Sequence, residues 1–452
     1  MALPTVLENI VARRRTHLAG IAERIGDAAP GPSTRSLFDS LNQPGHQFIM
    51  ECKAASPSLG VIRADYHPGD IARVYSRYAA GISVLCEPER FHGDYDHLAT
   101  VAASTHLPVL CKDFIIDPVQ VRAARHYGAD AILLMLSVLS NQEYAELAAV
   151  AESYNLDILT EVVDEEEMAR AEKLGAKIIG VNHRNLHDLS IDLGRSAKLA
   201  KLLPEGALLV AESGIRDHRT VVELAGHSDA FLVGSQLTGT PDVDEACRKL
   251  LYGELKVCGL TEGTSAQAAR AMGATYGGLI FEEASPRYIT AEKAVEIMDA
   301  EPNLKYVAVV RNLESLKQVP ADPRIVAYQI HAAVDARPEI PEDKEFWLAI
   351  NADNPPAQIP EAQRYILDKG QGGSGQAFDW NSIENLALSE EQLGRTLLAG
   401  GLNVDNIEGA LGVVDKQKMA GVDLNSGVER APGTKDAVKL RECTQTIRTF
   451  HI

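Results

Sequence analysis

The sequence predicts an α/β protein built of two tandem (βα)8 TIM barrels, and chain length, strand rhythm and strand composition all point to this fold. The 452 residues are long for one domain and suit two domains of about 200–250 residues each. From residue 47 onward, short apolar runs alternate with longer segments of helical periodicity. Continuous apolar runs separated by helices are typical of a parallel sheet covered by helices. Eight such units in about 200 residues suit a closed barrel.

The first half contains eight strand-like runs. Between them, segments such as 144–156 and 165–176 space apolar residues three and four apart, which predicts amphipathic helices. Residues 1–46 hold two further helical segments, so we expect the first barrel to carry an N-terminal helical extension. The runs cover residues 46–52, 81–86, 107–111, 131–136, 157–161, 177–182, 207–212 and 229–235.

The second half repeats the series. Its fifth run has the weakest strand signal, because the preceding stretch 332–345 is polar, contains proline and leaves little room for a helix. No linker rich in Ser, Pro or Gly separates the halves, and we expect the boundary near Tyr252–Gly253, giving domains 1–253 and 254–452. The runs cover residues 254–260, 276–281, 304–312, 325–331, 346–350, 364–368, 395–401 and 420–426.

Composition narrows the class of function. The formal net charge of −19 argues against a broad surface for nucleic acid or anionic membranes, although it permits local basic pockets for phosphate. The N-terminal segment lacks the apolar core of a signal peptide, and no run approaches 18 consecutive apolar residues. We therefore expect a cytoplasmic protein whose partners are small molecules, without nucleic acid or membrane, and a monomer.

The six cysteines do not form the pattern of a disulfide framework. Cys52, Cys86, Cys111 and Cys258 lie in or just after apolar runs, where a reduced thiol usually fills space in the core. No CxxC or HExxH spacing is present. We expect reduced thiols, no metal and no cofactor.

Candidate catalytic residues follow the apolar runs, because reacting groups of a barrel project from the C-terminal ends of its strands. One such charge alone is more often a solvated surface residue, but several converging on one barrel mouth can divide acid and base roles. The first half supplies Glu51, Lys53, Lys112, Glu161, Asn182 and Glu212. The second half supplies Cys258, Arg287, His331 and Asp368.

Small residues end the last two strands of both halves. They allow backbone N–H groups to approach a phosphate, which barrels usually bind at this position. Glycine at one strand–helix junction is a weak signal, but its repetition in both halves predicts two phosphate sites. The candidates are Ser213, Gly214, Gly234 and Ser235 in the first half, and Gly400, Gly401, Ser426 and Gly427 in the second.

Residues 370–375 match GxGxxG after a strand. A dinucleotide site would require an acidic residue at the end of the next strand, and that strand, 395–401, ends in glycines. We interpret the segment as a glycine-rich loop over a phosphate, with Gly373 as a candidate contact.

The first half resembles indole-3-glycerol-phosphate synthase, and the second resembles phosphoribosylanthranilate isomerase. The first resemblance rests on ECKAASPS (51–58), LCKDF (110–114), LTEV (159–162), VNHR (181–184) and AESGI (211–215). The second rests on KVCGL (256–260), SPR (285–287), LD (367–368) with the glycine loop, and DLNSGVE (423–429). Together they imply a fused bifunctional enzyme of tryptophan biosynthesis.

The resemblance implies roles for the candidates. In the isomerase, an Amadori rearrangement, Asp368 would open the ribose ring as an acid, Cys258 would move the C2 proton, and Arg287 would hold the anthranilate carboxylate. In the synthase, Lys112 would protonate or polarise the ketone before CO2 leaves, and Glu161 would assist dehydration.

Other synthase residues receive supporting roles. Lys53 would bind phosphate or carboxylate or share the acid role, which leaves the division between Lys53 and Lys112 open. Glu51, Asn182 and Glu212 would position the intermediate, and Ser56 and the small residues at 213, 214, 234 and 235 would contact substrate.

The second half departs from its family pattern in two places. After the fourth strand it has Gln329-Ile330-His331-Ala332 where the isomerases typically have Gln-Leu-His-Gly, and the next connection is shortened. Two alternatives therefore stay open for this half. One is a phosphosugar isomerase of histidine biosynthesis, which would be expected to use paired aspartates at strands one and five. The other is a non-catalytic barrel that binds phosphate.

Overall fold

The computed structural model describes residues 6–185, 189–331, 337–356, 358–369, 380, 383, 386 and 388–451. The chain divides into two compact units, the first formed mainly by residues up to 247 and the second mainly by residues from 248 onward. The division falls within helix α11 (Val243–Tyr252). The boundary expected at Tyr252–Gly253 lies at the end of this helix and stays a prediction.

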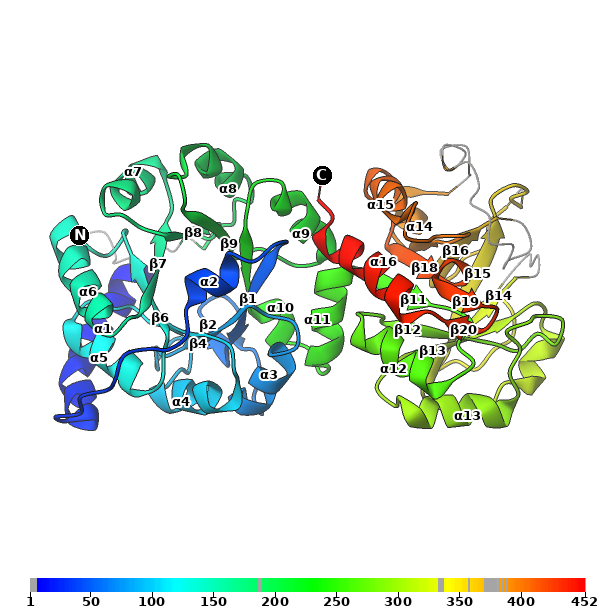
Figure 1. The fold of residues 1–452 in the computed structure, drawn as a ribbon, viewed down its shortest axis with the longest axis horizontal. Helices are drawn as coiled ribbons and strands as arrows, with labels where there is room; N and C mark the ends of the chain where they lie inside the picture. Colours follow the sequence, from blue (N-terminus) through cyan, green and yellow to red (C-terminus); the bar gives the residue numbers. More distant parts are fainter. Residues whose placement is uncertain are drawn as a thin grey trace. The chain divides into compact units, whose positions relative to one another are not determined.

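Each unit contains a closed barrel of eight parallel strands, with helices around it (Figure 1). The predicted fold class is confirmed. In the first unit, β1 pairs with both β4 and β10, which closes the barrel. Its strands are β1 (Gln47–Cys52), β4 (Gly81–Leu85), β5 (Val109–Lys112), β6 (Ala131–Met135), β7 (Asp157–Val162), β8 (Ile178–Asn182), β9 (Leu208–Glu212) and β10 (Ala230–Val233).

Each strand of this barrel is followed by a helix, and several of these helices begin at a residue whose side chain caps the first turn. Asp94, Asp117 and Asp164 each accept a backbone N–H of the first turn, and Ser140 with Glu143 forms a capping box. These helices are α3 (Pro68–Tyr75), α4 (Tyr95–Ser104), α5 (Pro118–His126), α6 (Asn141–Ser153), α7 (Glu165–Lys173), α8 (Gly194–Leu199), α9 (His218–Ala225) and α10 (Ser235–Thr238).

The two helices expected before the first barrel are present as α1 (Val6–Ile25) and α2 (Leu37–Leu41). Helix α1 buries Leu7 and Ile10, which join the apolar cluster of the first barrel. It also buries Arg14, whose guanidinium donates to both carboxylate oxygens of Asp113, at 2.8 and 2.6 Å. The extension is therefore packed against a strand end of the barrel.

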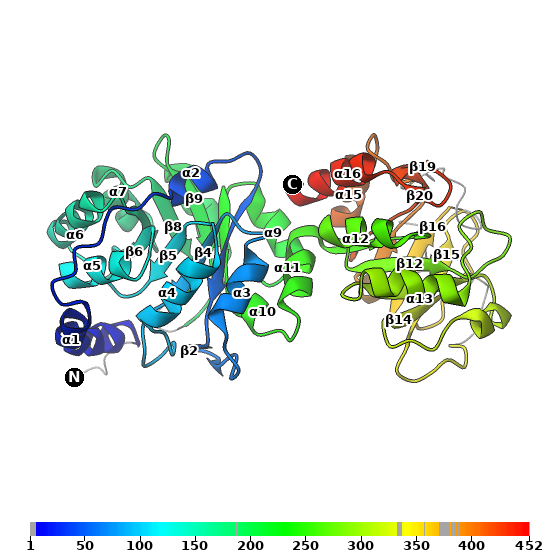
Figure 2. The same ribbon diagram turned by 60° about the horizontal axis from the view of Figure 1, so that its bottom comes forward.

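The second barrel has the same topology (Figure 2). Its strands are β11 (Glu254–Val257), β12 (Tyr276–Ile280), β13 (Lys305–Val310), β14 (Ile325–Ile330), β15 (Glu345–Asn351), β16 (Arg364–Asp368), β17 (Thr396–Leu398) and β18 (Gly421–Leu424). Its described α-helices are α12 (Gly263–Ala271), α13 (Ala291–Ala300), α14 (Glu390–Leu393), α15 (Ile407–Lys416) and α16 (Ala437–Thr449).

The run with the weakest strand signal forms a full strand of seven residues, β15. Trp347 is fully buried there and packs edge-on against Tyr276, with ring centroids 4.9 Å apart. This segment has only a weak local strand signal. It is stabilised by pairing with β14 and β16 and by the burial of the Trp347 ring. In the described part of the preceding connection, residues 337–344, there is no helix.

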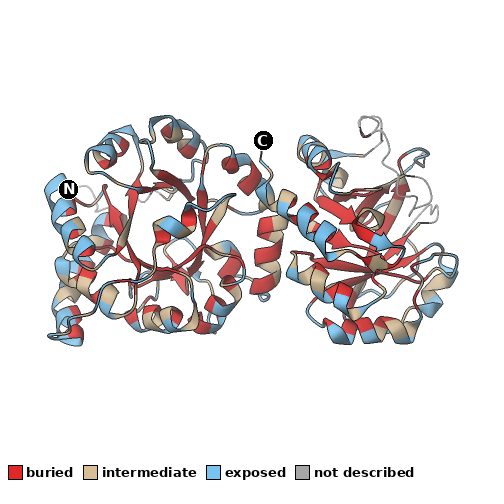
Figure 3. Cartoon of the chain, viewed as in Figure 1, coloured by how far each residue is buried: buried red, intermediate tan, exposed pale blue. Residues whose placement is uncertain are grey.

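Buried residues lie on the strands and on the inward faces of the helices, while exposed residues lie on the outer faces (Figure 3). Two short hairpins were not predicted: β2 (Ala55–Ser56) with β3 (Gly60–Val61), and β19 (Glu429–Ala431) with β20 (Thr434–Lys435). Both follow the C-terminal end of a barrel strand, and residues of the first hairpin line the first cavity described below. All six cysteines are free and buried, as expected.

Candidate functional sites

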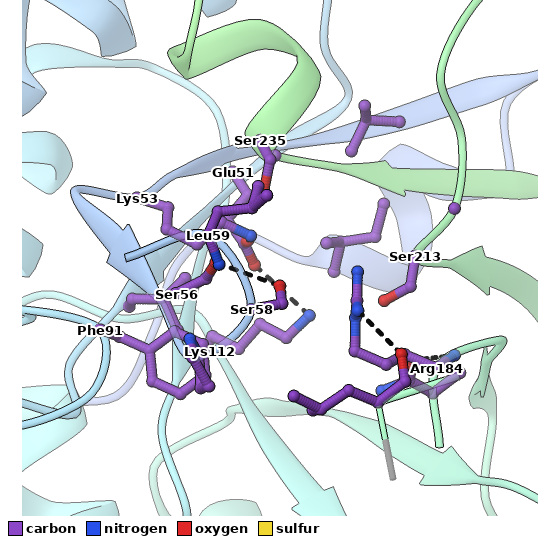
Figure 4. Close-up of a pocket in the computed structure, with 18 of the residues that line it drawn as sticks. Glu51, Lys53, Ser56, Ser58, Leu59, Phe91, Lys112, Arg184, Ser213 and Ser235 are labelled. Carbon is purple, nitrogen blue, oxygen red and sulfur yellow. Dashed lines mark hydrogen bonds and ion pairs between the residues drawn. The ribbon is translucent and has the colours of Figure 1, made fainter. Parts of the chain in front are cut away.

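The first cavity, of about 370 Å³, opens at the C-terminal ends of the first barrel's strands. Most candidate residues of the first half lie on its wall, although they come from strands far apart in the sequence. Figure 4 shows the side chains of Lys53, Lys112 and Arg184 around it. The predicted residues that line it are Glu51, Lys53, Ser56, Lys112, Glu161, Asn182, Ser213, Gly214, Gly234 and Ser235.

A network of ion pairs joins the lysines and glutamates of this cavity. Lys53 Nζ lies 2.7 Å from Glu51 Oε1, and Lys112 Nζ lies 3.4 Å from Glu51 Oε2. Lys112 also donates to Glu212 Oε2 at 2.9 Å. Burial alone would raise the pKa of Glu51, but the two ammonium groups outweigh it and lower that pKa to about 2. The same carboxylates keep the pKa of Lys112 above its usual value despite its burial.

Glu212 is fully buried and is not among the residues that line the cavity. Its carboxylate instead accepts from the Lys112 ammonium group. The expectation that Glu212 helps to position the intermediate therefore stays a prediction, in which it would act through Lys112. A Cβ at Gly180 would lie 2.1 Å from Glu212 Oε1, so only glycine on β8 leaves room for this carboxylate.

Glu161 is the one carboxyl group of the cavity whose pKa moves strongly upward. Burial is the largest cause, and the nearby charge of Glu212 adds to it, so that the pKa of Glu161 rises to about 8. Its Oε1 is buried without a hydrogen-bond partner. A carboxyl group in this environment is protonated near neutral pH and can act as an acid.

The end of the cavity expected to bind phosphate has unusual backbone geometry. Ser213 has φ of +67° and Gly214 has φ of +80°. The left-handed region is costly for serine, and it persists only where neighbouring contacts impose it. At Gly234 a Cβ would lie 2.5 Å from Glu51 Oε1, so this glycine leaves space for the ion-pair network.

Several lining residues were not singled out from the sequence. Arg184 lies two residues beyond the end of β8 and points a cation at the cavity, and the rule for strand ends could have found it. The apolar side of the wall comes from strands, loops and helix α1, which sequence spacing does not bring together. Its members include Val6, Ile10, Phe91, Phe114, Ile191 and Leu232.

The second cavity, of about 310 Å³, opens at the C-terminal ends of the second barrel's strands. It brings together Cys258 and Asp368, the proposed base and acid, which come from strands β11 and β16. Other predicted residues on its wall are Arg287, His331, Gly400, Gly401 and Ser426.

A buried ion pair lies beside the thiol of Cys258. Lys256 is fully buried, and its Nζ donates to Asp423 Oδ2 at 2.6 Å, while Asp423 Oδ1 has no partner. Burial raises the pKa of Cys258, although the charge of Lys256 acts in the opposite direction. Lys256 is therefore the positive neighbour that favours the thiolate, and burial outweighs it.

Arg287 is held by a second buried cluster. Its Nε and Nη2 donate to both carboxylate oxygens of Glu429, at 3.0 to 3.2 Å and 2.8 Å. Lys435 Nζ donates to Glu429 Oε1 at 2.8 Å. A Cβ at Gly259 would lie 2.6 Å from Arg287 Cδ, so the glycine after Cys258 makes room for the arginine stem. The fork of Arg287 is thus oriented before any ligand arrives.

Three predicted residues of the second half remain: His331, Gly427 and Gly373. His331 Nε2 lies 3.0 Å from Gln329 Nε2, and burial together with Lys256 and Arg311 lowers the pKa of His331 to about 4. Gly427 does not line the cavity: a Cβ there would lie 2.0 Å from the Leu402 carbonyl oxygen, so close backbone packing explains this glycine. Gly373 and the glycine-rich segment 370–375 lie outside the described residues.

In the described ranges no group of three or more His, Cys, Asp or Glu side chains is arranged to hold a metal ion. Among the helices of those ranges, none combines the length and apolarity needed to cross a membrane.

Comparisons with known proteins match each half of the chain to a family. The family profile of indole-3-glycerol phosphate synthase matches residues 7–250, and that of N-(5'phosphoribosyl)anthranilate (PRA) isomerase matches residues 255–446. The tryptophan biosynthesis protein TrpCF of Corynebacterium glutamicum is 58% identical over 479 residues, covering 99% of this chain and 99% of the relative.

A TrpCF protein of Yersinia pestis is 45% identical over 428 residues, covering 92% of this chain and 88% of the relative. A solved phosphoribosyl anthranilate isomerase from Thermus thermophilus is 29% identical, with a TM-score of 0.33, and covers 42% of this chain and 96% of that one. The chain therefore belongs to the TrpCF family, in which an indole-3-glycerol phosphate synthase domain is followed by a PRA isomerase domain.

Proposed function

We propose that the second unit isomerises N-(5'-phosphoribosyl)anthranilate to 1-(2-carboxyphenylamino)-1-deoxyribulose 5-phosphate, and that the first unit converts this product to indole-3-glycerol phosphate. Membership of the TrpCF family makes the chain a bifunctional enzyme of tryptophan biosynthesis, a carboxy-lyase joined to an isomerase. The observation that carries the residue assignments is the convergence of acid, base and cation at each barrel mouth.

In the isomerase, the protonated carboxyl of Asp368 donates its proton to the ring oxygen of the ribose. The lone pair of the anthranilate nitrogen then opens the C1–O bond and forms an iminium. The thiolate of Cys258 removes the C2 proton, which gives an enolamine that tautomerises to the ketone. Support comes from the placement of both side chains on one cavity wall.

The thiolate of Cys258 needs help, because burial raises the pKa of its thiol. Lys256, whose ammonium group is held by Asp423, supplies a fixed positive charge beside it. Arg287 pairs with the anthranilate carboxylate through the part of its guanidinium that faces the cavity, while Glu429 keeps the group oriented. This arrangement of charges supports an isomerase that transfers protons, rather than a non-catalytic barrel that only binds phosphate.

In the synthase, Lys112 donates a proton to the ketone oxygen as the anthranilate ring carbon that bears the carboxylate attacks the ketone carbon. Loss of CO2 restores the aromatic ring. Neutral Glu161 then protonates the departing hydroxyl group, a role that its raised pKa of about 8 supports. Its carboxylate then takes up the proton that the adjacent CH2 carbon loses as the indole double bond forms. Lys53 binds the carboxylate or phosphate from the other side of Glu51.

Phosphate binding is proposed for the small residues at the ends of the last two strands in each barrel: Ser213, Gly214, Gly234 and Ser235, and Gly400, Gly401 and Ser426. All of them line their cavities. The apolar side of the first cavity, with Phe91 and Phe114, suits the anthranilate ring. Localisation in the cytoplasm and a monomeric state remain part of the proposal.

One coupled assay tests the function. The purified chain receives N-(5'-phosphoribosyl)anthranilate as its sole substrate, and indole-3-glycerol phosphate is measured as the product. Formation of that product requires both activities. Failure with this substrate, but success with the carboxyphenylamino-deoxyribulose phosphate, would show that the second unit does not isomerise.

A further inference from the structure

His183 follows Asn182 at the end of β8, is fully buried and does not line the first cavity. It nevertheless contacts the loop expected to hold phosphate through two bonds. Its backbone N–H donates to the Glu212 carbonyl at 2.9 Å, and its ring Nδ1 lies 2.9 Å from the Ser213 carbonyl oxygen. A single residue therefore binds two consecutive carbonyl groups.

The partners of the imidazole define its tautomer. A carbonyl oxygen can only accept, so Nδ1 carries the proton and donates it to Ser213. In the neutral ring Nε2 is then the acceptor, and it lies 2.8 Å from Ser196 Oγ. Burial lowers the pKa of His183, which keeps the ring neutral. His227 Nε2 lies 2.9 Å from the same hydroxyl oxygen and completes a chain from His227 through Ser196 to His183.

The two bonds of His183 act on a strained part of the loop that follows β9. Ser213 lies in the left-handed region, with φ of +67°, and the two carbonyls bound by His183 lie on either side of this residue's backbone. The left-handed conformation is costly for a residue with a Cβ, so Ser213 needs contacts that impose it. Ser213 and Gly214 themselves line the cavity.

We propose that His183 is a positioning residue of the synthase: by holding the Glu212 and Ser213 carbonyls, it sets the backbone of Ser213 and Gly214 in the orientation that binds the substrate's phosphate. This inference rests on the proposed function, because it assigns the phosphate to that loop. His183 acts through the loop and does not touch the ligand.

Two substitutions separate the two ends of the ring. In His183→Asn, the side-chain amide nitrogen can occupy the place of Nδ1 and keep the donor to Ser213. In His183→Gln, the amide reaches the place of Nε2 and loses that donor. Both replace one polar planar group with another, so they serve as matched controls for packing. His183→Ala removes both ends.

The full chain and each variant are assayed for synthase KM and kcat and for competitive inhibition by inorganic phosphate, with isomerase activity as an internal control. We expect His183→Gln and His183→Ala to raise the KM and the phosphate inhibition constant about tenfold, the effect of one lost hydrogen bond, while kcat changes less than about threefold. His183→Asn should stay within about threefold of the unmodified chain for both constants.

Equal constants in the unmodified chain and in Gln and Asn variants would overturn the inference, as would a loss confined to kcat or to the temperature of unfolding. If the Ala variant does not fold, the comparison of Asn with Gln still decides. Absence of phosphate inhibition in the unmodified chain would instead overturn the placement of the phosphate, which distinguishes the two failures.

Discussion

The two cavities differ in how their buried cations are paired with carboxylates. In the first, two lysines and two glutamates form a continuous network, and every ammonium group has a carboxylate partner within 3.4 Å. Around the second cavity, three cations are paired in two clusters, Lys256 with Asp423, and Arg287 and Lys435 with Glu429, and Arg311 also lines this cavity. The thiol of Cys258 lies beside the first of these clusters.

Each arrangement of ion pairs suits the proton transfer proposed for its cavity. A proton donor to a ketone must stay charged until the reaction, and partners on both sides keep Lys112 protonated. A thiol base must instead lose its proton inside the protein, so it needs a nearby cation that is held in a fixed position. Because the two clusters use different carboxylates, Lys256 can stabilise the Cys258 thiolate while Arg287 binds the carboxylate of the anthranilate.

The largest expected effect is on Lys112. Lys112→Ala should lower synthase kcat about 1,000-fold, because it removes the proton donor and leaves the Glu51 and Glu212 carboxylates without their shared partner. Lys53→Ala, the matched control, should act mainly on KM, since Lys53 contacts only Glu51 within this network. Steady-state kinetics of both variants measure the split, and isomerase activity should be unchanged. Similar kcat values for the two variants would remove the distinction between the lysines.

In the second cavity, Cys258→Ser and Asp368→Asn should each lower isomerase kcat/KM at least ~100-fold, the scale for loss of a positioned acid or base. Isomerase assays on the full chain measure this effect, with synthase activity as the control. Near-normal isomerase activity in either variant would exclude that residue from proton transfer.

A smaller effect tests the ion pair beside the thiol. Lys256→Met should lower isomerase kcat/KM about tenfold at neutral pH, because the cation no longer favours the thiolate. The rising limb of the pH–rate profile should move to higher pH. Asp423→Asn should move it to lower pH, since the carboxylate acts on the thiol in the opposite direction.

Other charged groups face the same thiol region, including Lys435, and His331 faces Lys256. They are retained in both variants, so the opposite signs of the two shifts isolate the ion pair. Shifts in the same direction for both variants would contradict the assignment.

The smallest effect is on stability and concerns Glu161. Its folded-state pKa of about 8 lies above the value of 4.5 for an unperturbed glutamate. Folding therefore binds a proton between these values, and the carboxyl group makes the fold less stable as pH rises through this window. Glu161→Gln, which cannot ionise, should unfold a few degrees higher, about 2–4 °C at pH near 8, and show little change near pH 5.

Calorimetry of the full chain at the two pH values measures this difference. Asn182→Ala is a useful comparison, because it alters the same cavity wall without removing a titratable group. An equal gain in unfolding temperature at both pH values for Glu161→Gln would mean that the carboxyl group is not protonated by folding.

Much of the fold was predictable because parallel strands carry a strong local signal. The runs 131–136 and 207–211 are apolar throughout, and they form most of β6 and β9. The strand β15 was the least certain, because its formation depends on pairing with β14 and β16 and on burial of Trp347. The hairpin β2–β3 was missed, since two-residue strands have no periodicity to detect.

The sites were predictable to the extent that their residues end strands. Lys112 and Glu161 were found by this rule and lie together on one wall. The rule does not report depth, so it could not show that Glu212 is fully buried and reaches the cavity only through Lys112. It also treated Gly427 as a phosphate contact, whereas that glycine is required by the Leu402 carbonyl.

The two-barrel architecture, the polar strand ends and the chemistry of those groups follow from residue order, because periodicity and strand-end position are local properties. Which charges pair, which are buried and which cation lies beside the thiol depend instead on how the barrel closes. Ion pairs such as Lys256 with Asp423 join residues from the first and last strands of a closed barrel. Their energies depend on distance and desolvation, which barrel closure sets and residue order does not record.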